Sequence, residues 1–187
     1  MTERGAELID RLASVRRATR RAAATGAGLT AAQLDALTYL ASCNRFSDTP
    51  AAVAEYLATT RGTASQSLLA LERKGLLHRE PDPLDGRVHH LRPTEAGLDL
   101  VGASARADAV ADALAALGPD AERLEILLER CLRTAQLRRG GRTFGTCREC
   151  RHLGGRPSDR RCGLTGLGLT EADTGLLCIE HEPVRPA

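Results

Sequence analysis

Four cysteines and a histidine are concentrated near the C-terminus of this 187-residue chain. Cys147 and Cys150 are separated by two residues, the same gap separates Cys178 from His181, and Cys162 lies between the two pairs. A two-residue gap lets the backbone turn so that both side chains reach one metal ion. In a reducing compartment, clustered cysteines hold metal more often than they form disulfides. The spacing therefore predicts a metal site in this segment.

The cluster offers five ligands where tetrahedral zinc needs four. We expect a structural zinc site, and its preferred ligands are Cys147, Cys150, Cys162 and Cys178. His181 is the substitute if one cysteine stays free, whereas His152 is expected to be solvated or to lie next to the ligands. The aromatic content of this segment is limited to Phe144, so a hydrophobic core is hard to build there. Zinc binding would supply the missing folding free energy directly.

Two other chemistries remain open for these thiols. An iron–sulfur cluster would make the segment a sensor of oxygen, nitric oxide or iron, although the spacing matches no ferredoxin pattern. Redox-active or unpaired thiols are the other alternative. Two further cysteines stand apart: Cys43 has Arg45 as its only visible basic neighbour, which argues against a reactive thiolate, and Cys131 is expected to act as a small hydrophobic residue.

The composition limits the classes of protein that could carry such a site. A hydrophobic content of 42% is enough for a folded core, but an aromatic content of 2% disfavours readers of single-stranded RNA. The formal net charge of +2 means that a nucleic-acid surface would be a local patch. Neither a secretory leader nor an apolar segment of membrane length is visible, so we expect a cytoplasmic protein with no membrane partner.

Helix signals dominate the first half of the chain. Apolar residues at helical spacing predict a helix over 6–24. Thr30, with Gln33 three residues later, forms a capping box for the next helix. Thr49 precedes a proline and starts a third helix, and a fourth follows after a short connection and stops at Gly75. Two short helices joined by a tight turn indicate a helix-turn-helix.

The next segment extends this pattern. Two extended runs flank "PDPLDGR", residues 81–87, which predicts a β-hairpin with an arginine near its tip and hence a winged helix. His89 and His90 fall on opposite faces of the second run, so we expect structural or phosphate-facing roles and not a metal pair. One long helix over 94–117 and another over 119–139 then carry more apolar surface than one small domain requires, which predicts a homodimer.

Residues 6–137 closely resemble the MarR family of bacterial winged-helix transcriptional regulators, and "DPLDGR" and "LRPTEAG" are the most diagnostic motifs. The resemblance implies a mainly α (α+β winged-helix) fold. Residues 1–138 would form the DNA-binding and dimerisation domain, and residues 139–187 a Cys-rich metal-binding tail that most members of the family lack. It also implies a homodimer acting as a repressor on a palindromic operator in double-stranded DNA, and an effector of unknown identity.

The residues that would contact DNA lie at the start of the second helix of the pair and on the wing. The helix offers Arg61, Thr63, Ser65, Gln66 and Ser67, among which Arg61 and Gln66 are the best candidates to read bases in the major groove. Arg87 on the projecting hairpin suits the minor groove, and Asp85 would orient it through a bidentate pair. The alternative is that Asp85 and Arg87 merely close the turn.

Two other classes of function compete with a regulator. A protein-interaction module would use a degenerate winged helix to present the cysteine-rich tail to a partner, and it would lack salt-dependent DNA binding. An enzyme is not expected, because no Ser/His/Asp or paired-carboxylate arrangement is visible and a four-thiolate metal leaves no open position for water.

Overall fold

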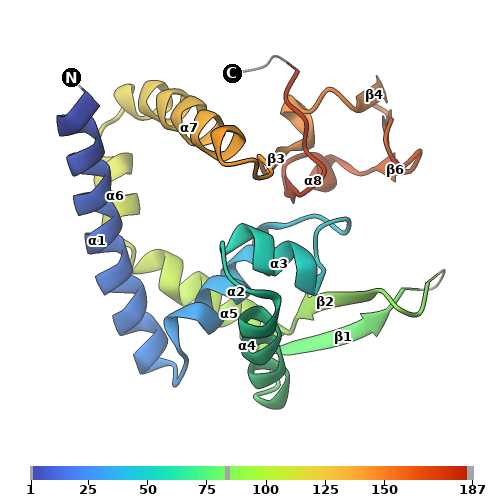
Figure 1. The fold of residues 1–187 in the computed structure, drawn as a ribbon, viewed down its shortest axis with the longest axis horizontal. Helices are drawn as coiled ribbons and strands as arrows, with labels where there is room; N and C mark the ends of the chain where they lie inside the picture. Colours follow the sequence, from blue (N-terminus) through green and yellow to red (C-terminus); the bar gives the residue numbers. More distant parts are fainter. Residues whose placement is uncertain (1, 83–84, 185–187) are drawn as a thin grey trace.

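The computed structural model describes residues 2–82 and 85–184, and it is mainly helical with small antiparallel sheets (Figure 1). The long first helix α1 (Thr2–Gly26) packs against α2 (Ala31–Ser42). Thr30 forms the expected capping box with Gln33 at the start of α2. Among the described residues, no helix is long and apolar enough to cross a membrane.

Two further helices complete the helix-turn-helix. Helix α3 (Pro50–Tyr56) begins after Thr49, whose side chain accepts a hydrogen bond from the amide of Ala52. Helix α4 (Arg61–Arg73) follows after four residues, and Gly75 ends the turn beyond it with a φ of +69°. The helix starts and stops predicted from the caps are confirmed. The core beneath these helices is built from buried aliphatic side chains and one ring: Leu34, Leu37, Tyr39, Val53, Leu68, Leu71, Leu77 and Leu91.

The wing is a two-stranded antiparallel hairpin, as predicted. Strand β1 (Leu77–Pro81) pairs with β2 (His89–Pro93), with Leu77 opposite Pro93. The hairpin leads into α5 (Glu95–Arg106), which approaches it so closely that a Cβ on Gly97 would overlap the carbonyl oxygen of Leu76. A glycine is therefore required where α5 crosses the base of the wing.

The single helix expected over 94–117 was wrong, because the chain breaks there into α5 and α6 (Ala109–Ala115). Asp108 is the reason: its carboxylate accepts hydrogen bonds from the amides of Val110 and Ala111 and so caps a new helix. The same carboxylate lies 2.9 Å from the guanidinium of Arg16, which ties α6 to α1.

The peripheral helices leave their apolar residues exposed. Helix α7 (Asp120–Arg138) extends across the top of the molecule towards the tail (Figure 1). The structure describes every residue of this helix, and none of them is buried. Cys131 on α7 is exposed in the single chain and does not fill a core position. The exposed apolar side chains of α1 and α7 include Leu8, Ile9, Leu12, Val15, Ile126, Leu127, Leu128, Leu132 and Leu137.

The tail is a compact unit of short strands. Strand β3 (Gly145–Thr146) leads into a 3-10 turn, η1 (Cys147–Glu149), and pairs with β7 (Leu177–Cys178). A separate three-stranded sheet and one short helix complete it, namely β4 (Leu153–Arg156), β5 (Asp159–Cys162), β6 (Gly168–Leu169) and α8 (Glu171–Thr174).

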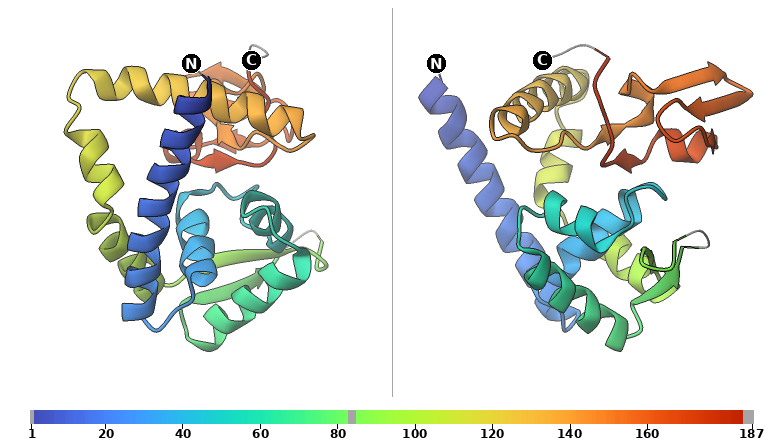
Figure 2. Two further views of the ribbon diagram at one scale, coloured as in Figure 1. Left: turned by 60° about the vertical axis from the view of Figure 1, so that its left-hand side comes forward. Right: turned by 45° about the vertical axis from the view of Figure 1, so that its right-hand side comes forward.

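The tail docks onto the winged helix. Figure 2 shows it lying next to the connection between α2 and α3, which we call the α2–α3 loop (residues 43–49). The amide of Asn44 donates to the carbonyl oxygen of Leu177 at 2.9 Å, and Phe144 packs edge-on against Tyr39 and Tyr56. Helix α7 ends at Arg138, close to the expected domain boundary, and the division into two domains stays a prediction.

Candidate nucleic-acid interface and cysteine cluster

The start of α4 presents polar side chains outward while its other face is buried. Thr60 caps the helix by accepting a hydrogen bond from the amide of Thr63 at 3.1 Å. Ala64, Leu68 and Leu71 anchor the helix in the core. The residues predicted to contact DNA occupy the remaining face: Arg61, Thr63 and Gln66 are exposed, and Ser65 and Ser67 are half-buried. This arrangement leaves Arg61 and Gln66 free to reach base edges in a major groove.

Arg87 stands at the tip of the wing with 90% of its side chain exposed. Asp85 holds the guanidinium in a bidentate pair, with Nε 3.0 Å and the terminal nitrogen 3.1 Å from the two carboxylate oxygens. The same carboxylate accepts the backbone amide of Arg87, and these bonds hold the pKa of Asp85 below its ordinary value. The pair therefore closes the turn and also orients the arginine outward, so both of its expected roles are compatible with the geometry.

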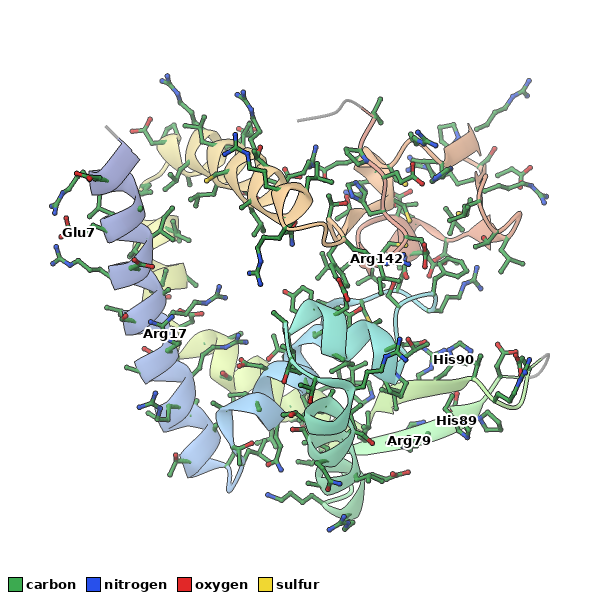
Figure 3. The ribbon with its side chains drawn as sticks, viewed as in Figure 1. Glu7, Arg17, Arg79, His89, His90 and Arg142 are labelled. Atoms are coloured by element: carbon green, nitrogen blue, oxygen red, sulfur yellow. The ribbon has the colours of Figure 1, made fainter. Side chains whose placement is uncertain are left out.

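An ion-pair network around the buried carboxylate of Asp48 lies along the wing, where β2 carries His89 and His90 (Figure 3). His90 sits between two carboxylates: Nδ1 lies 2.6 Å from Oδ1 of Asp48, and Nε2 lies 3.0 Å from Oδ2 of Asp82. Both carboxylates raise the pKa of His90. Arg92 adds a second cation 2.9 Å from Asp48, a residue only 2% exposed. Asp48 was not predicted from the sequence, because its partners lie more than forty residues away.

The four tail cysteines come together around one small cavity. Cys147 begins η1 and Cys150 follows its last residue, and the amide of Cys150 donates to the carbonyl oxygen of Cys147 at 3.1 Å. Cys162 ends β5 and Cys178 ends β7. All four thiols line the cavity, whose wall also includes Phe46, His152, Leu153 and Leu169. Three of the cysteines are buried and Cys162 is half-buried. Residues that are far apart in the sequence are thus gathered at one point.

The thiols are electrostatically linked. A hydrogen bond between Cys147 and Cys178 raises the pKa of Cys147 and lowers that of Cys178. Further N–H groups point at the sulfurs: the Asn44 side chain lies 3.9 Å from Sγ of Cys147, and the amide of Glu182 lies 3.5 Å from Sγ of Cys150. Donors of this kind stabilise thiolates and are typical partners of metal-bound sulfur.

The cluster matches a thiolate-bound ion in the type and number of its ligands. Within residues 2–82 and 85–184, however, no three His, Cys, Asp or Glu side chains form a group that could hold a metal ion as they stand. The thiols would therefore have to close in around an ion. Zinc and iron–sulfur clusters are the groups that four cysteines favour.

His181 does not belong to the cluster. Its ring packs on Gly145, where a Cβ would lie about 2.5 Å away, and its Nδ1 lies 2.8 Å from the hydroxyl of Thr143. It lines a different hollow, beside Arg142 and Arg151. His152, in contrast, lines the cysteine cavity, and its Nε2 lies 3.2 Å from a carboxylate oxygen of Glu182. If a histidine replaced one of the cysteine ligands, His152 would therefore be better placed than His181, because it already lines the cysteine cavity.

Cys43 is placed as a structural thiol. It is 8% exposed, and burial raises its pKa to about 12. A thiol with so high a pKa is almost wholly protonated at neutral pH and is a poor nucleophile.

The helix pair and hairpin together define a winged helix-turn-helix protein. In agreement with this class, residues 27–88 match the model of the MarR family, a family of transcription regulators and not of enzymes. The comparison with curated proteins found no match. The matched segment ends in the wing, so the cysteine tail lies outside it.

Solved structures show the same fold. A single-residue mutant of MepR from S. aureus is 25% identical, with a TM-score of 0.53, over 70% of this chain and 98% of that one. A MarR-family transcriptional regulator from Silicibacter pomeroyi is 22% identical, with a TM-score of 0.55, over 65% of this chain and 82% of that one. The reduced form of MarR from E. coli is 24% identical, with a TM-score of 0.54, over 68% and 95% of the two chains.

Proposed function

We propose that this protein is a MarR-family transcriptional regulator that binds double-stranded DNA. The observation that carries the proposal is the pairing of two exposed elements on one fold, the polar face of α4 and the wing with Arg87 at its tip. In a winged helix these two elements enter a major groove and a neighbouring minor groove. Arg61 and Gln66 read bases, Thr63, Ser65 and Ser67 contact base edges or phosphates, and Arg87 occupies the minor groove.

A second copy of the chain completes the regulator. The apolar side chains exposed along α1 and α7 form a surface that a soluble monomer rarely leaves open. A homodimer that buries them places two α4 helices on successive half-sites, which requires a palindromic operator. Occupation of such an operator blocks transcription where it overlaps a promoter, and we propose repression as the output.

For the tail we propose one structural zinc ion held by Cys147, Cys150, Cys162 and Cys178. The convergence of these four thiols on one cavity supports it. Bound zinc would replace an aliphatic core and hold the tail in its docked position. An iron–sulfur cluster is the alternative occupant, and elemental analysis with a visible spectrum of anaerobically purified protein separates the two.

The DNA-binding proposal is tested by site selection followed by a salt titration. Full-length protein is used to select a site from a random duplex library, and its affinity is then measured by fluorescence anisotropy at several salt concentrations. We expect a site with two-fold symmetry and an affinity that falls linearly with salt on logarithmic axes, because phosphate contacts release counterions. Failure to select any duplex would instead favour the protein-interaction module.

The wing is tested by Arg87→Ala. Each wing of the dimer loses one charge-assisted contact worth about 1.5 kcal/mol, so the two together should weaken binding to the selected site by roughly 100-fold. Dimerisation and the melting temperature should not change, because the Arg87 side chain is exposed. Arg161→Ala in the tail is the matched control, since it also removes an exposed arginine paired with a nearby aspartate. Unchanged affinity in Arg87→Ala would show that the pair with Asp85 only closes the turn.

A further inference from the structure

The α2–α3 loop lies between the cysteine cavity and strand β2 of the wing. Its residues Asn44, Ser47 and Asp48 are polar, and they are 1%, 0% and 2% exposed. Polar groups buried to this extent are costly unless they are hydrogen-bonded. Each of the three has partners, and the partners lie on two different parts of the molecule.

On one side the loop binds the cysteine cluster. The side-chain NH2 group of Asn44 donates to Sγ of Cys147, and the side-chain oxygen of Asn44 accepts from the hydroxyl of Ser47 at 3.0 Å. The residues on either side of Cys178 are also fixed: Leu177 accepts the amide of Asn44 at 2.9 Å, and the amide of Ile179 donates to the Ser47 hydroxyl at 2.8 Å. Two of the four thiols are thus held against this loop.

On the other side the loop binds three consecutive residues of β2 through Asp48. Its carbonyl oxygen accepts the amide of Leu91 at 2.7 Å, and its carboxylate pairs with His90 at 2.6 Å and Arg92 at 2.9 Å. His90 continues the contact to the side chain of Asp82.

The remaining bonds reach the tip of the wing. The side chain of Asp82 accepts the amide of Asp85 at 2.9 Å, and Asp85 holds the guanidinium of Arg87. Two series of hydrogen bonds and ion pairs, joined only by the peptide bond between Ser47 and Asp48, therefore run from the cysteine cluster to the arginine that would enter the minor groove. Hydrogen-bond and ion-pair networks of this kind can carry coupling between two sites when both sites influence the same element.

We propose that occupancy of the cysteine site by metal controls DNA affinity through the α2–α3 loop, with Asn44, Ser47, Asp48 and His90 as positioning residues. This inference rests on the proposed zinc site and the proposed DNA binding. Metal draws Cys147 and Cys178 into fixed positions, which keeps the partners of Asn44 and Ser47 in place. Without metal the tail loses its hold on the loop, Asp48 is no longer fixed, and the wing is less ordered.

The experiment compares zinc-loaded and chelator-stripped full-length protein on the selected duplex at fixed salt. Wild-type protein should lose roughly tenfold in affinity on stripping, within the usual range for allosteric coupling. By reciprocity, saturating duplex should tighten the two zinc-binding steps of the dimer by the same factor taken together, which is about threefold per site, measured by competition with a chromophoric chelator. Equal affinity of loaded and stripped protein for DNA, with no effect of DNA on zinc affinity, would overturn the inference.

Variants locate the coupling. Asn44→Ala leaves all four thiols in place, so it should still bind one zinc per chain, but stripping should change its DNA affinity by less than about twofold. Ser42→Ala is the matched control, because its hydroxyl donates to the carbonyls of Thr38 and Tyr39 within α2, and it should keep the full tenfold response. If Asn44→Ala does not fold, Ser47→Ala provides the same comparison. A full response in a folded loop variant would show that the signal bypasses the loop.

The outcomes separate this inference from the proposals beneath it. If the protein binds no metal, the proposed zinc site is refuted. If it selects no duplex, the proposed DNA-binding function is refuted. Protein that binds both ligands independently retains both functions and refutes the coupling alone.

Discussion

The winged helix and the cysteine tail are stabilised by different interiors. Beneath α2, α3 and α4, the fully buried side chains are chiefly leucines, together with Val53 and Tyr39. Among the described tail residues, 139–184, the buried side chains are those of Thr143, Cys147, Cys150, Thr174, Cys178 and His181. The leucines of the tail are half-buried or exposed, as Leu164 at 49% and Leu167 at 51% illustrate. One region therefore has a hydrophobic core, and the other has thiols where such a core would be.

This difference has a consequence for how each region responds to its surroundings. Aliphatic burial depends little on metal or redox state, whereas a thiolate cluster depends on both. The two regions meet at the α2–α3 loop, and we expect the order of the tail to depend on a bound ligand much more than the aliphatic core of the winged helix does. The comparison predicts that the two regions can be destabilised separately.

The largest effect is expected from Cys147→Ser with Cys150→Ser. Removal of two ligands should abolish zinc binding, which in small zinc domains is worth about 10 kcal/mol or more, and the tail should unfold. Trypsin would then cleave at the tail arginines well before it cleaves within α2, α3 and α4, as followed by mass spectrometry and zinc analysis. Cys131→Ser, which removes an exposed thiol on α7, is the control. A double variant that keeps its zinc and its protease resistance would contradict the thiolate interior.

A smaller loss of stability, confined to the winged helix, is expected from Leu68→Ala. Leu68 is 0% exposed, and truncation of a buried leucine typically costs about 2–5 kcal/mol of unfolding free energy. Denaturation followed by circular dichroism should show this loss, while the folded variant still binds one zinc per chain. Leu164→Ala in the tail is the matched control and should change neither quantity appreciably. Equal losses from the two leucine variants would mean that the tail also depends on aliphatic packing.

Local signals account for the parts of the fold that were predicted correctly. Thr30 and Gln33 are three residues apart, Thr49 precedes a proline at the first helical position, and the turn formers around Asp85 define the wing. The break at Asp108 was not predicted because the surrounding alanine-rich sequence favours continuous helix. The cap that Asp108 forms is reinforced by Arg16, 92 residues away.

The candidate sites follow the same division. The exposed face of α4 could be anticipated from helical periodicity, since Leu68 and Leu71 fix which side is buried. The two-residue gap between Cys178 and His181 resembles a ligand pair, but the structure turns the histidine towards Thr143. The link between Asp48 and His90 spans 42 positions and depends on the docking of β2 against the α2–α3 loop, which no local pattern encodes.

The smallest expected effect concerns pH and arises at the junction of the two regions. His90 lies between Asp48 and Asp82, with Arg92 on the same strand, and the carboxylates raise its pKa above 6.5 in the folded state. A group whose pKa is raised by folding stabilises the protein fully below its unfolded pKa, and this contribution is lost as the pH rises through the folded pKa. The wild type should therefore lose unfolding free energy relative to His90→Gln as the pH increases from about 6 upward. Glutamine keeps hydrogen-bonding capacity but cannot gain a proton, and the comparison at each pH cancels the titration of the cysteines. Parallel stability curves for the two proteins over this range would show that His90 is held by packing and not by charge, and the wing would then be joined to the loop chiefly through Leu91 and Arg92.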